Sequence, residues 1–66
     1  MEEVFERTMF LEMNNCRKHY KECLVQAIKE LIPEYYLKDI FTIFGITYNE
    51  YIEDMANSYI RYKNQK

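Results

Sequence analysis

The sequence contains very few of the residues that make tight turns, with one glycine and one proline among 66 residues. A β-sheet protein needs a turn between each pair of neighbouring strands, and glycine and proline are prominent in such turns. Apolar residues make up 48% of the chain and charged residues 30%, a balance typical of folded rather than disordered proteins. The composition therefore predicts a folded, all-α protein.

A long apolar run is also missing. No segment approaches the roughly 18 apolar residues of a membrane-spanning helix. The opening residues MEEVFER have no basic stretch of the kind that begins a secretion signal. We therefore expect a cytoplasmic protein that does not enter a membrane.

Motifs for catalysis are absent as well. The sequence has no glycine-rich phosphate loop, no HExxH or GxSxG motif and no EF-hand spacing. So short a chain forms one domain at most, which we place over residues 1–66, and it has little room for a ligand pocket of roughly several hundred cubic ångströms. The sequence predicts a protein that is not an enzyme, uses no cofactor and binds no small molecule.

The two cysteines and the single histidine are the candidate metal ligands. Cys16, His19 and Cys23 would point the same way from a helix. A structural zinc site takes four ligands, however, and the neighbouring sequence supplies no fourth. The two cysteines would lie roughly 10 Å apart on a helix, which is too far for a disulfide bond. We therefore expect buried, reduced thiols and no metal site.

The first half of the chain has the pattern of one long amphipathic helix, which we predict over residues 3–31. Neither glycine nor proline occurs between Glu2 and Ile32, and a stripe of apolar residues recurs with alternating spacings of four and three. This heptad stripe consists of Met9, Met13, Cys16, Tyr20, Cys23 and Ala27. Asn14 and Asn15 are weak helix formers, so a break at this pair is the alternative.

The heptad stripe also predicts a homodimer. At about 1.5 Å per residue, the first helix would be about 45 Å long and the next one only about 17 Å. Part of the stripe would therefore stay uncovered within one chain. Uncovered apolar stripes commonly meet a partner, and two-fold dimers are the commonest soluble oligomers. We predict that the six stripe residues form the dimer interface.

A second helix is predicted over residues 34–44. Pro33 disfavours helical geometry in the residue before it and suits the first turn of the helix that follows. An apolar face then continues along the segment. Its members are Tyr36, Leu37, Ile40, Phe41 and Phe44. This is the most hydrophobic of the predicted helices.

A third helix is predicted over residues 48–63, so that the last two helices form a helical hairpin. Gly45 stands just after the second helix, where a residue with positive φ commonly ends a helix. Thr47 and Glu50 have the spacing of a capping box, which begins a helix. The end of one helix, the corner and the start of the next are therefore encoded within six residues.

The third predicted helix combines aromatic side chains with an acidic start. Large amphipathic rings are favoured at protein interfaces. We predict a protein-interaction surface that consists of Tyr48, Tyr51, Glu53, Asp54, Tyr59 and Tyr62. The sequence thus favours a small, non-enzymatic interaction module that regulates or inhibits a larger protein by occupying a groove or a basic site on it. An assembly subunit that binds only itself is a further option.

The corner around Gly45 resembles that of a helix-turn-helix motif, which gives an alternative function as a dimeric DNA-binding transcriptional regulator. Phe41 stands where such motifs usually have a small residue, and Asp54 where they usually have an apolar one. The helix after the corner has three acidic residues and no basic residue before Arg61. DNA affinity depends largely on contacts of lysine and arginine with phosphates. The sequence therefore favours protein binding over DNA binding.

The basic cluster RKHYK contains the candidate nucleic-acid contacts under this alternative, Arg17, Lys18 and Lys21. On one continuous helix they would lie opposite the heptad stripe. They could contact phosphates or an acidic partner, or form an ordinary solvated face next to Glu12 and Glu22. The net charge of −2 favours the solvated face.

Overall fold

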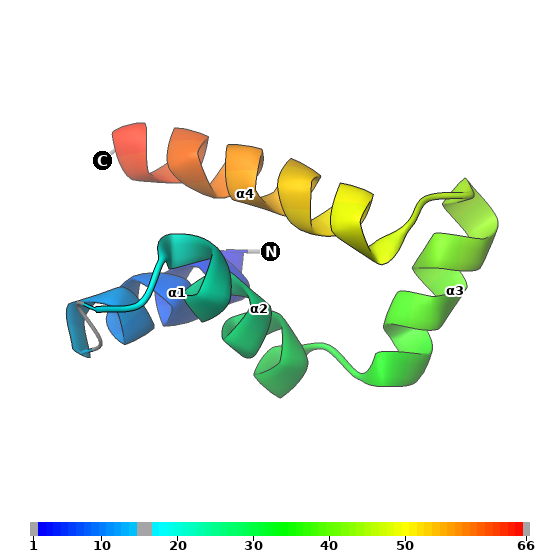
Figure 1. Cartoon of the computed structure of the whole chain (residues 1–66), viewed down its shortest axis with the longest axis horizontal. Helices are drawn as coiled ribbons and strands as arrows, with labels where there is room; N and C mark the ends of the chain where they lie inside the picture. The colour runs from blue at the N-terminus through cyan, green and yellow to red at the C-terminus, as the bar shows by residue number, and fades with distance from the viewer. Residues whose placement is uncertain (1, 15–16, 66) are drawn as a thin grey trace. The chain divides into compact units, whose positions relative to one another are not determined.

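The structure is a computed structural model that describes residues 2–14 and 17–65 (Figure 1). The described residues form four helices and no strand, so the predicted all-α class is confirmed. The helices are α1 (Glu2–Asn14), α2 (Tyr20–Leu31), α3 (Glu34–Phe44) and α4 (Tyr48–Asn64). None of the described helices combines the length and the apolar character that crossing a membrane requires.

The chain divides into two compact units. The first unit is Met1–Leu31 and contains α1 and α2, and the second is Ile32–Lys66 and contains α3 and α4. The boundary lies beside Pro33, the residue expected to end the first helical segment. That the two units behave as one domain over residues 1–66 stays a prediction.

The single helix predicted over residues 3–31 is wrong, because α1 ends at Asn14 and α2 begins at Tyr20. The described part of the connection, residues 17–19, is a turn and a bend. The alternative of a break at the asparagine pair is the one that the structure supports on the Asn14 side, while Asn15 lies outside the described residues. The Asn14 side-chain amide donates a hydrogen bond of 2.9 Å to the Phe10 carbonyl oxygen, the local bonding that makes asparagine favour helix ends.

The start of α2 is capped by a histidine. The His19 carbonyl oxygen accepts hydrogen bonds from the backbone N–H groups of Glu22 and Cys23. Its ring Nδ1 accepts a further bond of 3.2 Å from the backbone N–H of Lys21. A side chain that accepts from the second residue of a helix is the usual N-cap arrangement. Histidine is not among the common capping residues, so the sequence contained no recognisable start signal at this position.

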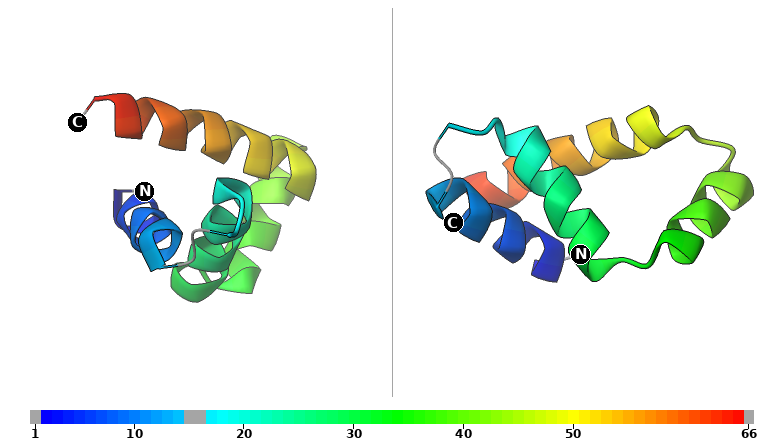
Figure 2. Two further views of the ribbon diagram at one scale, coloured as in Figure 1. Left: turned by 60° about the vertical axis from the view of Figure 1, so that its left-hand side comes forward. Right: turned by 60° about the horizontal axis from the view of Figure 1, so that its bottom comes forward.

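The core of the first unit lies between two helices that each bury one stripe. α1 and α2 pack side by side (Figure 2). The buried residues are Val4, Phe5, Thr8 and Leu11 on α1 and Cys23, Leu24, Ala27 and Ile28 on α2. Thr8 is the one buried polar residue of α1, and its hydroxyl donates a 2.7 Å hydrogen bond to the Val4 carbonyl oxygen. Its burial therefore leaves no unsatisfied donor.

An ion pair joins α1 to α2 at the surface of the first unit. The Arg7 Nε donates to Glu30 Oε2 at 2.8 Å, and the Gln26 amide donates to Glu30 Oε1 at 3.3 Å. The Arg7 guanidinium also lies over the Phe10 ring, 5.1 Å from its centroid. Exposed ion pairs contribute little to stability. The hydrogen bond from Arg7, with a second from Gln26, nevertheless lowers the pKa of the Glu30 carboxyl.

We expect Arg7→Ala to raise the pKa of the Glu30 carboxyl toward its ordinary value, as followed by the carboxyl ¹³C shift of Glu30 against pH. Because the folded-state pKa lies below the unfolded one, the ionised carboxylate stabilises the fold above the unfolded-state pKa. That contribution is lost as pH falls through the folded-state value. Arg17→Ala is the control, since Arg17 makes no ion pair within residues 2–14 and 17–65. Identical Glu30 titrations in wild type and Arg7→Ala would contradict the prediction.

The predicted bounds of α3 are confirmed. Pro33 is the N-cap residue, with φ −61°, and its carbonyl oxygen accepts from the N–H groups of Tyr36 and Leu37. At the other end, Gly45 has φ 63°, in the left-handed region. The Phe41 carbonyl oxygen accepts from the N–H groups of the two residues that follow the helix, which is the usual helix end at a left-handed glycine.

The capping box that begins α4 is present. The Glu50 backbone N–H donates to Thr47 Oγ1 at 3.2 Å, and the Thr47 backbone N–H donates to Glu50 Oε1 at 3.1 Å. The Phe41 ring meets the rings of Tyr48 and Tyr51 edge-on, with centroids 6.0 Å and 5.5 Å apart. Hydrogen bonds and ring contacts together therefore hold the corner between α3 and α4.

Candidate functional site

The six residues predicted as a protein-interaction surface do not share one exposed face. Tyr48, Glu53 and Asp54 are exposed, Tyr62 is half-buried, and Tyr51 and Tyr59 are buried. The helical period explains this division, because the rings follow the buried side of α4 while the two carboxylates project from another side. The exposed surface of α4 is therefore smaller and more acidic than the sequence predicted.

Tyr51 and Tyr59 belong to the core. Their exposed fractions are 6% and 0%, so neither ring is available on the surface of this structure. The Tyr51 hydroxyl oxygen is buried and has no hydrogen-bond partner among the described residues. Burial also raises the pKa of this phenol, so it stays protonated at neutral pH. The Lys63 ammonium lies 5.2 Å from the Tyr59 ring centroid, a cation–π contact at the end of α4.

The heptad stripe is not continuous, because the helix is interrupted between α1 and α2. Of its members, Met13 is exposed, Met9 and Tyr20 are half-buried, and Cys23 and Ala27 are buried, while Cys16 lies outside the described residues. Burial raises the pKa of the Cys23 thiol, and the nearby carboxylate of Glu12 raises it further, which disfavours the reactive thiolate. The predicted interface required one long helix, which the structure does not contain. The homodimer itself stays a prediction.

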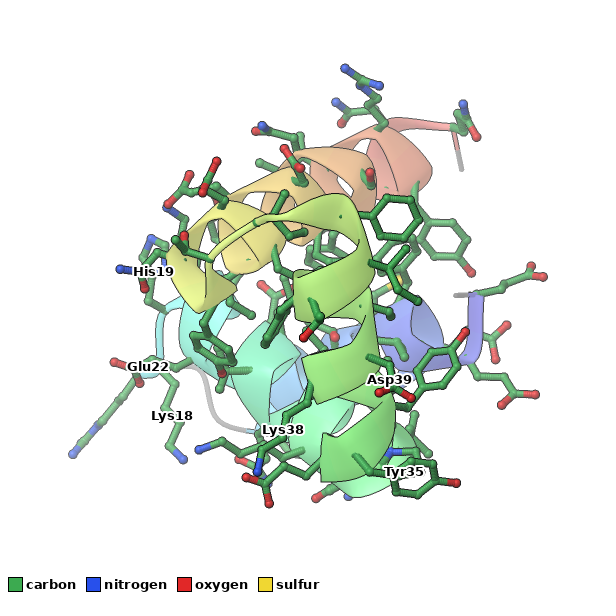
Figure 3. The ribbon with its side chains drawn as sticks, turned by 90° about the vertical axis from the view of Figure 1, so that its right-hand side faces the viewer. Lys18, His19, Glu22, Tyr35, Lys38 and Asp39 are labelled. Atoms are coloured by element: carbon green, nitrogen blue, oxygen red, sulfur yellow. The ribbon has the colours of Figure 1, made fainter. Side chains whose placement is uncertain are left out.

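The basic cluster lies at the start of α2 rather than along a continuous helix. Arg17 and Lys18 are exposed in the connection before α2, and Lys21 is half-buried in its first turn. Figure 3 shows Lys18 beside His19 and Glu22 at this end of the helix. The positive end of a helix dipole lies there, so cations at this position are unfavourable for the helix. No group of three or more side chains suited to a metal ion occurs among residues 2–14 and 17–65.

The exposed apolar surface of α3 is the feature that the sequence did not predict. Leu37 is the single residue of α3 that is buried. Four large apolar residues of this helix are more than half exposed: Tyr35 at 71%, Tyr36 at 54%, Ile43 at 74% and Phe44 at 70%. With Asp39, which lies among them, they form what we call the α3 surface. Several large apolar side chains exposed on one short helix commonly mark a protein-interaction site.

Asp39 is the charged centre of the α3 surface. It lies one helical turn from both Tyr35 and Ile43, and its side chain is exposed. Within the described chain its carboxylate has neither an ion pair nor a side-chain hydrogen bond. Lys38, the residue before Asp39, projects from a different side of α3 (Figure 3). The α3 surface thus presents one carboxylate between Tyr35 and Ile43.

Comparison with known proteins identified no related protein. No protein-family model matches this sequence, and no curated protein or solved structure matches it.

Proposed function

We propose that this chain is a small cytoplasmic interaction module that binds a larger protein through the α3 surface and thereby regulates or inhibits it. The observation that carries the proposal is the exposure of four large apolar side chains on α3, a helix of 11 residues. Tyrosine and other large apolar side chains supply most of the binding energy in many interfaces. Exposure of apolar side chains to water is unfavourable, so binding of a partner that covers them is favoured.

Several exposed apolar residues lie elsewhere, but they are more scattered. Phe10 and Met13 are exposed on α1, and Ile60 is 40% exposed on α4. Single exposed apolar residues are common on protein surfaces and need no partner. α3 differs because its exposed residues recur along two to three turns of one helix. This arrangement is typical of a helix that docks on another protein.

Charge argues against nucleic acid as the partner. The first two turns of α4 carry Glu50, Glu53 and Asp54, which would face phosphates if α4 entered a DNA groove. The exposed cations Arg17 and Lys18 lie in the other unit of the chain. The DNA-binding alternative therefore rests on the corner alone, and it is tested by the same experiment as the proposed function.

The test is a pull-down with the tagged chain from native cell extract, with and without nuclease, using three versions of the protein. The double variant Ile43→Gln/Phe44→Gln removes two apolar side chains of the α3 surface but keeps good helix-forming potential. Ile60→Gln is the matched control on α4. We expect one protein partner that survives nuclease, loses about tenfold or more in recovery with the double variant and is retained by the control. Helix content measured by circular dichroism shows that all versions fold.

Two results would overturn the proposal. The first is equal recovery of the partner by wild type and the double variant, which would place the binding site elsewhere. The second is recovery of nucleic acid without protein, lost on nuclease treatment and on raising salt, which is the behaviour of a protein that neutralises phosphates.

A further inference from the structure

Building on the proposed function, we propose that the α3 surface binds an amphipathic helix of the partner protein, and that a lysine or arginine of this helix pairs with Asp39. The inference concerns the chemistry of the partner, which exposure of apolar residues alone does not specify. It rests on the position of Asp39 within the α3 surface, on the charges around it and on the geometry of helix pairs.

Asp39 lies in the path of a partner that covers both Tyr35 and Ile43. Tyr35 and Ile43 lie one turn before and one turn after it on the same side of α3, and Tyr36 lies next to that side. A helix that contacts both Tyr35 and Ile43 therefore covers the carboxylate between them. Burial of a carboxylate without a cation or hydrogen-bond donor is strongly unfavourable. The partner must consequently supply a hydrogen-bond donor or a cation at this point, and a lysine or arginine supplies both.

The chain itself offers Asp39 no cation. Its nearest neighbours along α3, three and four residues away, are Tyr35, Tyr36, Thr42 and Ile43, and none is basic. Lys38 projects from a different side of the helix (Figure 3). Among the described residues, the Asp39 carboxylate makes no ion pair. An arginine or lysine from outside would therefore meet an unpaired carboxylate, which forms a strong, charge-assisted hydrogen bond.

A helical segment of the partner suits this surface. Tyr35, Asp39 and Ile43 follow one another at spacings of four along α3, which makes a ridge, and ridges of one helix pack into the grooves of another. The partner helix would present apolar side chains at spacings of three and four, with the basic residue in the middle. Arginine is the better ligand, because its planar guanidinium binds a carboxylate with two hydrogen bonds and also stacks on tyrosine rings.

A second copy of this chain is a poor occupant of the same surface. In a two-fold dimer of antiparallel α3 helices, the pairing that brings Tyr35 of one copy onto Ile43 of the other places the two Asp39 carboxylates opposite each other. Like charges in direct opposition disfavour such a pairing. The charge pattern thus selects a different protein rather than self-association through α3.

The probe for the experiment is a synthetic amphipathic helix of about 15 residues made of leucine and lysine, with a leucine and glutamate peptide of the same pattern as its counterpart. Affinities are measured by titration calorimetry for wild type, Asp39→Asn and the matched control Asp54→Asn, which changes an exposed acid on α4. Amide chemical shifts of the labelled protein locate the binding site.

We expect the lysine peptide to bind the wild type with shift changes centred on residues 35–44, and the glutamate peptide to bind at least about tenfold more weakly. Asp39→Asn should weaken binding of the lysine peptide by about tenfold. Asp54→Asn should change it by less than about twofold, because an exposed distant charge is screened. This combination would support the proposed pairing.

Every other pattern overturns the inference. Equal losses in Asp39→Asn and Asp54→Asn would indicate diffuse attraction between opposite charges, and equal binding of both peptides would indicate apolar contact without charge selection. Absence of binding would show that the surface does not take such helices. Sedimentation that reports a dimer lost in Ile43→Gln would assign α3 to self-association. The pull-down with the double variant is independent of these results, so the proposed function can stand when this inference fails.

Discussion

Leu24→Ala is expected to lower the free energy of unfolding by about 2–5 kcal/mol. Leu24 is fully buried on α2, with an exposed fraction of 0%, and it is among the largest side chains that are removed entirely from water. Truncation loses the burial of its side chain and leaves a cavity that neighbouring residues fill only in part. A chain of this length has a total stability of roughly 3–10 kcal/mol, so the variant should lose a large share of its stability.

Leu31→Ala is the matched control, because it makes the same chemical change at the end of the same helix, where the side chain is 45% exposed. We expect it to cost less than about 1 kcal/mol. Urea denaturation followed by circular dichroism at the helix signal measures both variants. Equal midpoints for Leu24→Ala and Leu31→Ala would mean that the interior of the first unit is not packed as described.

Gly45→Val is expected to cost about 2 kcal/mol or more, because valine must adopt a left-handed backbone that its branched side chain strongly disfavours. Gly45 has φ 63°, and a Cβ atom placed on it would meet nothing within 4 Å. A Cβ atom at this position would therefore overlap with no residue beyond its two neighbours in the chain. The loss would report mainly the backbone conformation of the corner between α3 and α4.

Gly45→Asn separates this effect from the loss of glycine as such. Asparagine tolerates the left-handed region better than other residues with a side chain, so we expect a cost of less than about 1 kcal/mol. Urea denaturation again provides the measurement, and amide chemical shifts of residues 41–50 report the corner itself. Similar losses for valine and asparagine would show that the corner does not require positive φ in solution.

Local signals determined the second half of the chain. Pro33 acts on the residue before it, Gly45 acts through its own φ, and the Thr47–Glu50 pair closes hydrogen bonds across one helical turn. Each device operates within a few residues, so it can be recognised without knowledge of the rest of the fold. The bounds of α3 and the start of α4 consequently followed from the sequence.

Tertiary packing decided the first half. Helix propensity is a weak preference, and nothing between Glu2 and Ile32 except the asparagine pair argues against a continuous helix. The structure instead breaks the segment and packs α1 on α2, which lets each helix bury a stripe against other parts of the same chain. The gain from burial depends on contacts between residues far apart in sequence, and the capping role of His19 appears only once the break exists.

The candidate site shows the same division between local and tertiary information. The heptad stripe joined residues that the structure divides between α1 and α2, and the spacing of apolar residues carried no information on which face of a helix is covered. Tyr51 and Tyr59 are buried while Tyr35 and Tyr36 are exposed, although all four carry the same side chain. The sequence alone determined the helical class, the corner and the ends of α3, because those depend on composition and on interactions within a turn. Only the tertiary structure decided which rings enter the core and which remain on the α3 surface, because burial is a property of neighbours that the chain brings together by folding.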